Sequence, residues 1–227
     1  KYIAMATMLL NHFAHVFLDH GSTLFAVFTG IGYFTAPVMV YFMVEGYGYT
    51  RSKKKYFLRL LLFAVLSQFP YFYGLGIGNL NMLFTLCLCF GIIWLDKNVE
   101  NKVLRIGAQV LLVFLSGFCD WAFLAPLYTL FFLWAEGDRK KTAAAYGLAT
   151  ALFGAFLLAS GTMQGLTGAR LGLELLYASG VAAAGVCVVC LYNGKRMERG
   201  RTFSKWFFYC FYPAHLLVLG ILAEVLL

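Results

Sequence analysis

The sequence predicts an all-α fold, a polytopic membrane helical bundle of about nine transmembrane helices. Hydrophobic residues make up 62% of the 227 residues and charged residues only 12%, whereas soluble domains carry roughly 25% charged residues. The mean hydropathy is +0.78. The 23 Phe and 14 Tyr residues suit a surface that faces lipid and is anchored by aromatic rings at the membrane interfaces. We therefore expect the lipid bilayer to be a constant partner of the chain.

Apolar segments that could each cross a membrane follow one another along the chain. Such a span needs about 20 apolar residues, or fewer where the bilayer is locally thinned. We place the spans at 2–19, 24–46, 56–73, 80–96, 103–119, 121–136, 142–161, 172–192 and 206–226. Only Cys119 and Asp120 separate the fifth span from the sixth, so these two should form a tight hairpin. Residues 1–227 are expected to form a single integral membrane domain.

The loops between the spans predict the orientation. All basic residues except Arg170 fall on one side of the membrane when the spans alternate in direction. Basic residues are retained on the cytoplasmic side, so we expect the N-terminus inside the cell and the C-terminus outside. This asymmetry accounts for the net charge of +8 without a nucleic-acid partner. The first span carries Asn11, His12 and His15 where a signal peptide would have an unbroken apolar core, so no cleavable signal peptide is expected.

Two histidines lie near the middle of apolar spans, His12 in the first and His215 in the last. An ionisable side chain at membrane depth usually faces a partner or a cavity and is a functional candidate, and an imidazole exchanges a proton near neutral pH. His15 and Asp19 follow His12 at helical spacing, with Asn11 beside it, so we expect a polar stripe that lines a cavity open to the exterior. The structural alternative is a histidine that only hydrogen-bonds a neighbouring helix.

A dense basic loop follows the second span. It contains Arg51, Lys53, Lys54 and Lys55, with Tyr56 after it. The loop could cradle the phosphates of a cytosolic ligand, or it could only set the topology and contact anionic lipid. Glu45 before the loop and Arg59 after it lie at the same membrane face, where they could pair.

Further polar residues lie in or beside the spans. Asn81 and Thr85 are one turn apart in the fourth span, and Asp120 precedes Trp121 at the outer hairpin, where an acid could orient a histidine or an incoming amine. Five of the six cysteines lie in apolar spans and are expected to behave as small apolar side chains. The pair Cys187 and Cys190 has no second pair to complete a four-ligand site, so we expect no metal.

Taken together, these segments resemble the TraX family of membrane proteins, named for a conjugative pilin acetylase. The resemblance covers almost the whole chain in order and rests on Met8-Leu-Leu-Asn-His12, Val44-Glu-Gly-Tyr47, Thr50-Arg51, Tyr56, Arg59-Leu60, Asn81, Leu83-Phe84-Thr85-Leu86, Asp120-Trp121 and Phe211-Tyr-Pro-Ala-His-Leu216. One position departs from the family pattern, which usually has Asp where this chain has Asn11.

The resemblance implies an activity. The family looks related to membrane acyltransferases that take an acyl group from cytosolic acyl-CoA and deliver it across the membrane by means of a histidine in an early span. By that resemblance His12 is the catalytic base or acyl carrier, and His215 is a second participant, with Asp120 placed to assist. The site would lie in a bacterial cytoplasmic (inner) membrane, and acetyl-CoA would be a co-substrate, with no cofactor bound permanently.

The ligand contacts follow from the same resemblance. The CoA phosphates would meet Arg51, Lys53, Lys54, Lys55, Tyr56 and Arg59. The candidates for substrate contacts or for oxyanion donors are Asn11, His15, Glu45, Asn81 and Tyr212. The extracytoplasmic acceptor stays open: a pilin N-terminus, a glycan or a peptide would each supply an amine or hydroxyl.

Two other function classes fit the polar residues in part. A transporter or lipid flippase would use the intramembrane histidines as a proton relay, although the sequence has neither a detectable repeat nor paired broken helices. A scaffold without catalytic activity in an envelope complex would explain the fold but not the buried polar residues.

Overall fold

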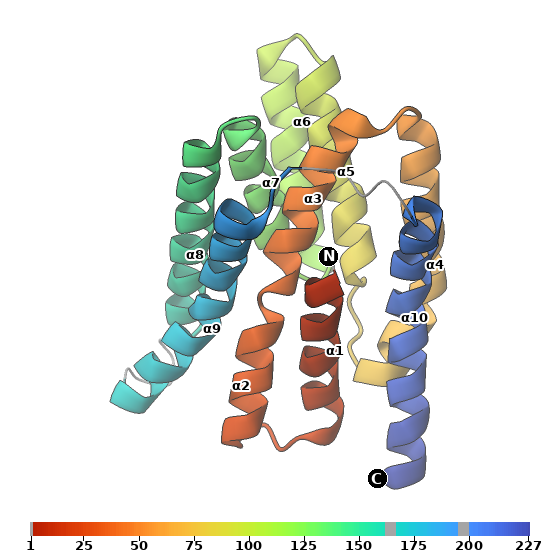
Figure 1. Ribbon diagram of the computed structural model, residues 1–227, viewed down its shortest axis with the longest axis vertical. Helices are drawn as coiled ribbons and strands as arrows, with labels where there is room; N and C mark the ends of the chain where they lie inside the picture. The colour runs from red at the N-terminus through yellow and green to blue at the C-terminus, as the bar shows by residue number, and fades with distance from the viewer. Residues whose placement is uncertain (1, 162–166, 195–199) are drawn as a thin grey trace. The chain divides into compact units, whose positions relative to one another are not determined.

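A computed structural model describes residues 2–161, 167–194 and 200–227, and every regular element in these ranges is helical (Figure 1). The α-helices are α1 (Tyr2–Phe17), α2 (Thr23–Gly32), α3 (Thr35–Tyr49), α4 (Lys53–Leu75), α5 (Met82–Asn98), α6 (Lys102–Leu115), α7 (Leu124–Ala135), α8 (Arg139–Gly161), α9 (Gly168–Val186) and α10 (Arg201–Leu226). A 3-10 turn follows α6 at Ser116–Phe118, and a π-helical turn extends α9 at Cys187–Leu191.

The helices confirm the predicted class of an all-α integral membrane protein. Five helical segments are long and apolar enough to cross a membrane: Thr23–Tyr49, Lys53–Leu75, Arg139–Ser160, Gly168–Leu191 and Thr202–Leu226. The helices α1 and α7 are apolar but shorter. On α4 the large side chains of Leu62, Leu66 and Phe69 are all more than half exposed, as expected of a helix face that contacts lipid rather than water.

The second predicted span consists of two helices rather than one. The helix α2 ends at Gly32, with Tyr33 as its C-cap residue, and α3 begins at Thr35. Pro37 lies in the first turn of α3, where its missing N–H leaves no intrahelical hydrogen bond unmade. A continuous helix would instead place that proline in its interior, so the break lies just before it.

The connection between α6 and α7 is longer than the two residues expected. It includes the 3-10 turn and residues 119–123, in which Trp121 and Phe123 adopt positive φ angles of 54° and 60°. Left-handed backbone is strained for residues other than glycine. The segment therefore needs external contacts to hold it.

The contacts divide the chain into two compact units. The first comprises residues 1–39 and 134–192, and its helices α1, α2, α8 and α9 pack closely through small residues. A Cβ atom on Gly180 of α9 would lie 2.1 Å from the carbonyl oxygen of Gly30 on α2, and one on Gly185 would lie 2.7 Å from Cβ of Tyr146 on α8. These glycines let the helix backbones approach closely, because any larger residue there would collide with the neighbouring helix.

The second unit comprises residues 40–133 and 193–227. Its central pair is α4 and α10, which lie side by side (Figure 1). Phe63 stacks on Tyr209 in the first half of both helices, and Gly74 packs against the backbone of Leu216 further along, so the two helices run parallel. The neighbouring α5 returns antiparallel to α4, because Asn81 before α5 reaches Ala64 while Phe90 contacts Tyr56. The predicted third and ninth spans, which correspond to α4 and α10, should run in the same direction if successive spans alternate, and the parallel pair agrees with this.

Candidate functional site

The strained segment at 119–123 is anchored within the second unit by Leu80. The N–H of Leu80 donates to the carbonyl of Phe118 at 3.0 Å, and the N–H of Asp120 donates to the carbonyl of Leu80 at 2.7 Å. The hydroxyl of Thr85 on α5 donates to the carbonyl of Asp120. Backbone strain of this kind persists only where surrounding contacts determine it, and it is frequent at functional sites.

Asp120 is the acidic member of a polar cluster that this segment presents to α4 and α10. Its carboxylate interacts electrostatically with the phenols of Tyr71 on α4 and Tyr212 on α10. Burial raises the pKa of the Asp120 carboxyl to about 6, and the N–H of Trp121, which donates to Oδ1 at 2.9 Å, opposes that rise. A carboxyl group with a pKa near neutral can exchange a proton under physiological conditions.

Tyr212 and His215, both on α10, belong to the same cluster. Both are buried, with their rings 5.8 Å apart, and the hydroxyl of Tyr212 lies near the N–H of Met82 at the start of α5. Nδ1 of His215 lies 2.7 Å from the carbonyl of Phe211. Because a carbonyl only accepts, Nδ1 carries the proton, and Nε2 is the basic nitrogen of the neutral ring.

Asn81 has a structural position beside this cluster. Its Nδ2 donates to the carbonyl of Ala64 and to Oε1 of Gln68, both at 2.8 Å, and its Oδ1 accepts the N–H of Leu83 at 3.0 Å. Both amide hydrogens are thus engaged, which leaves Asn81 poorly suited to donate to an oxyanion. Ser67, fully buried on α4, has a hydroxyl that no described residue hydrogen-bonds.

The predicted basic loop is mostly helical, because α4 begins at Lys53 and its first turn holds Lys53, Lys54 and Lys55. Lys53 donates from Nζ to the carbonyls of Tyr47 and Thr50, and Nζ lies 4.3 Å above the ring of Tyr47, so this lysine caps the end of α3. The side chains of Arg51, Lys54 and Lys55 are exposed.

Arg59, one turn beyond the basic loop on α4, is a partly buried cation among tyrosines. Its guanidinium donates to the hydroxyl of Tyr209 and interacts with Tyr56, while its buried Nε has no hydrogen-bond partner among the described residues. Glu45 lies one turn from Tyr41 on α3 and interacts with its phenol. A cation surrounded by phenols is suited to an anionic ligand.

In the first unit, His12 is partly buried on α1, and His15 is exposed one turn further on. His15, His20 and Phe25 form an aromatic cluster at the turn into α2, with ring centroids 4.6–6.0 Å apart. Asn11 donates to the carbonyl of Thr29 at 3.4 Å. Asp19 lies in the turn beyond α1 and accepts the N–H of Gly21, so it does not extend the helix face of His12 and His15 as predicted.

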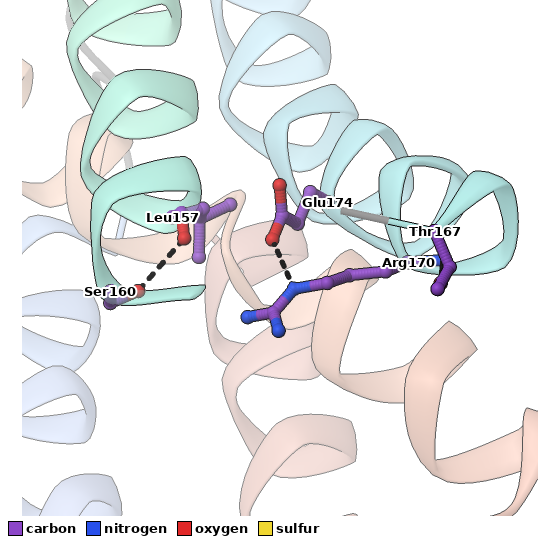
Figure 2. Close-up of polar contacts among 5 residues, drawn as sticks. All are labelled: Leu157, Ser160, Thr167, Arg170 and Glu174. Carbon is purple, nitrogen blue, oxygen red and sulfur yellow. Dashed lines mark hydrogen bonds and ion pairs between the residues drawn. The ribbon is translucent and has the colours of Figure 1, made fainter. Parts of the chain in front are cut away.

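The first unit also holds a buried ion pair on α9. Nε of Arg170 donates to Oε1 of Glu174 at 3.0 Å, and the helix spacing of four residues brings the two side chains together (Figure 2). Glu174 is only 7% exposed.

Comparison with known proteins identifies the family. The chain matches the TraX protein family over residues 1–223. It belongs to the TraX family. The chain is also 30% identical over 235 residues to the "Probable fimbrial assembly protein FimC, serogroup H1" of Dichelobacter nodosus, and the match covers 96% of this chain and 92% of that protein. No solved structure matches the chain.

Within the second unit of this TraX protein, the predicted residues Asp120, Tyr212 and His215 lie in one cluster, and Tyr56 and Arg59 lie in another. The sequence reasoning missed Tyr71 and Tyr209. Tyr71 follows Ser67 and Gln68 at helical spacing on the polar side of α4, which is the signal that could have included it. Tyr209 has no such signal, because its role comes from the packing of α10 on α4.

Proposed function

We propose that this TraX protein is a membrane-embedded acyltransferase that transfers an acyl group, acetyl by family resemblance, from cytosolic acyl-CoA to an amine or hydroxyl of an extracytoplasmic acceptor. The relative from D. nodosus is named for fimbrial assembly, which supports a fimbrial or pilin N-terminus as the acceptor, with glycans and other peptides as further candidates. The bacterial cytoplasmic membrane is the proposed location.

One observation carries the proposal: the helix pair α4–α10 contains both a cation site and a polar cluster with a basic nitrogen. Arg59 and Tyr209 form the first, and Tyr71, Tyr212 and His215 the second. Residues 59 and 71 are separated along α4 by about 18 Å at 1.5 Å per residue. The phosphopantetheine arm of CoA is an extended chain of comparable length, so phosphates at Arg59 would place the thioester near Tyr212.

The proposed chemistry uses the histidines as bases. Within the second unit, Nε2 of His215, beside Tyr212, removes a proton from the acceptor amine or hydroxyl while that group attacks the thioester carbonyl. By the family resemblance, His12 is the other candidate for this base. The hydroxyl of Tyr212 donates to the tetrahedral oxyanion. Collapse of this intermediate breaks the carbon–sulfur bond, and the imidazolium returns its proton to the CoA thiolate. In the second form of the mechanism a ring nitrogen of His12 attacks the thioester and CoA leaves as the thiolate. The acceptor amine or hydroxyl then attacks the acyl-imidazole, which releases His12, and the proton lost by the acceptor passes to the CoA thiolate.

The test is transfer of radiolabelled acetyl from acetyl-CoA by the purified protein in lipid nanodiscs. We expect His12→Ala to lower the transfer rate by about 100- to 10,000-fold, the range for positioned acid–base catalysis. His20→Ala is the control, because this exposed histidine in the turn after α1 is not among the candidate site residues, and it should keep most of the activity. A folded His12→Ala protein with full activity would refute the role of His12. Proton-coupled uptake into liposomes without CoA dependence would instead establish the transporter.

A further inference from the structure

The ion pair of Arg170 and Glu174 lies in the first two turns of the apolar segment Gly168–Leu191. Glu174 follows Gly168 by six residues, which places it about 9 Å along the axis of α9. Both side chains extend from α9 toward the end of α8 that carries Ser160 (Figure 2). This end of the hairpin is the predicted extracytoplasmic side, and Arg170 is the single basic residue predicted there.

Arg170 hydrogen-bonds only one of the two carboxylate oxygens of Glu174. Oε1 of Glu174 accepts from Arg170, whereas Oε2 is buried and receives no hydrogen bond from any described residue. An ionised carboxylate has about four acceptor positions, and an oxygen that is buried without a donor loses its hydration with nothing in return. Buried polar atoms in folded proteins are otherwise nearly always paired, so this oxygen is suited to a donor from outside the chain.

We propose that Glu174 is a binding site for the ammonium group of a primary amine that enters from the extracytoplasmic side. Oε2 accepts a hydrogen bond from the ammonium, and Arg170 holds the carboxylate in position through Oε1. An ammonium supplies both the missing donor and a positive charge beside a buried negative one, whereas an alcohol supplies only the donor. The proposal rests on the proposed function only in equating this amine with the acyl acceptor.

A metal ion is less suited to the site than an ammonium. Within the described ranges, no group of three His, Cys, Asp or Glu side chains is arranged to hold a metal. A single carboxylate that already binds a guanidinium would leave most of the coordination sphere of a divalent cation to water. An ammonium needs fewer partners and is therefore the ligand that this carboxylate fits.

The experiment measures binding of a probe pair to the full-length protein in nanodiscs without acyl-CoA. The first probe is the tripeptide amide Ala-Leu-Gly-NH2 with a free amine, and the second is the same peptide with an acetylated amine. We expect the free amine to bind more tightly than the acetylated peptide. Glu174→Gln should weaken binding of the free amine by about 10- to 100-fold, the usual range for a hydrogen bond to a charged group, and should leave the acetylated peptide unaffected.

Glu224→Gln is the matched control, because it removes one acidic charge from the same predicted side of the membrane at an exposed position. It should leave both affinities unchanged. Glu174→Asp keeps the charge but shortens the side chain, and its affinity for the free amine should lie between those of the wild type and Glu174→Gln. If Glu174→Gln does not fold, a wild-type affinity of Glu174→Asp would contradict the site. If the two peptides bind equally well, or if Glu174→Gln binds the free amine as the wild type does, the proposal is wrong. Oε2 of Glu174 would then bind only a water molecule.

Adding acetyl-CoA separates this inference from the proposed function. If both hold, Glu174→Gln raises KM for the amine while the binding of acetyl-CoA stays at the wild-type level. Selective amine binding through Glu174 without any acetyl transfer would refute the acyltransferase and leave the amine site standing. Acetyl transfer with no dependence of KM on Glu174 would refute the site and leave the acyltransferase standing.

Discussion

Gln68 and Asn81 are joined by two hydrogen bonds to a single oxygen. Oε1 of Gln68 accepts the backbone N–H of Asn81 at 3.0 Å and its Nδ2 at 2.8 Å, and Nε2 of Gln68 donates to the carbonyl of Asn79 at 3.0 Å. The side chain thus fixes the segment that leads into α5. Because Asn81 is committed to this network, we assign it a positioning role and retain Tyr212 as the proposed oxyanion donor.

Replacing Gln68 by Leu should destabilise the protein. The substitution leaves the N–H and Nδ2 donors of Asn81 without their acceptor in a buried position, which costs about 1–3 kcal/mol. The thermal unfolding midpoint in detergent should fall, while Leu66→Ala, at an exposed position of the same helix, should change it less. An unaltered midpoint for Gln68→Leu would show that the network does not stabilise the fold.

Gly180 and Gly172 offer a matched comparison on α9. A Cβ atom on Gly180 would lie 2.1 Å from the backbone oxygen of Gly30, whereas one on Gly172 would meet nothing within 4 Å. Gly180→Ala must push α2 and α9 apart and should lower the free energy of unfolding by about 1–3 kcal/mol. Gly172→Ala should be neutral or slightly stabilising, because alanine favours the helix. Equal unfolding midpoints for the two variants would contradict the close approach of the helices.

Asp120 should make stability depend on pH. Its pKa is raised from 3.8 to about 6 in the folded protein, so the folded state binds more protons than the unfolded state between these values. The free energy of unfolding should therefore fall as pH rises from about 4 to about 6 and level off above that range.

Asp120→Asn should remove this contribution, since an amide stays neutral and its oxygen can still accept the N–H of Trp121. The measurement is the unfolding midpoint of both proteins at pH 4.5, 5.5, 6.5 and 7.5. As pH rises, the unfolding midpoint of the wild type should fall relative to that of Asp120→Asn, because only the wild type has to keep a charged carboxylate buried. A difference that stays constant across this range would show that burial does not perturb Asp120.

Arg59 should be more important for CoA binding than its exposed neighbours. Arg59→Met keeps an unbranched apolar side chain but removes the guanidinium and its charge-assisted contact, so we expect Kd for CoA to rise about 10- to 100-fold. Lys102→Ala, at the exposed first residue of α6 on the same predicted face, controls for general electrostatic attraction and should change Kd little. Binding by equilibrium dialysis is the check, and an unchanged Kd for Arg59→Met would remove the cation site from the proposal.

Sequence alone predicted the helical membrane class because composition and apolar length determine it. It also selected Asp120, Tyr212 and His215, since polar residues in apolar segments are conspicuous. It did not predict that Lys53 caps α3 or that Gln68 binds Asn81, because these contacts depend on how the chain turns between helices. The division of the second span at Tyr33 was likewise missed, although Pro37 gave a local signal for it.

The parallel pairing of α4 with α10 has a consequence for biosynthesis. Tyr73 and Glu224, which share a hydrogen bond across this pair, are 151 residues apart in the chain. A ribosome must therefore translate and insert several intervening helices before α4 meets its permanent neighbour. During that interval Arg59 lacks its partner Tyr209 of α10, so this face of α4 needs temporary shelter by the insertion machinery, and a nascent chain that stalls before α10 should be a preferred target of membrane proteases.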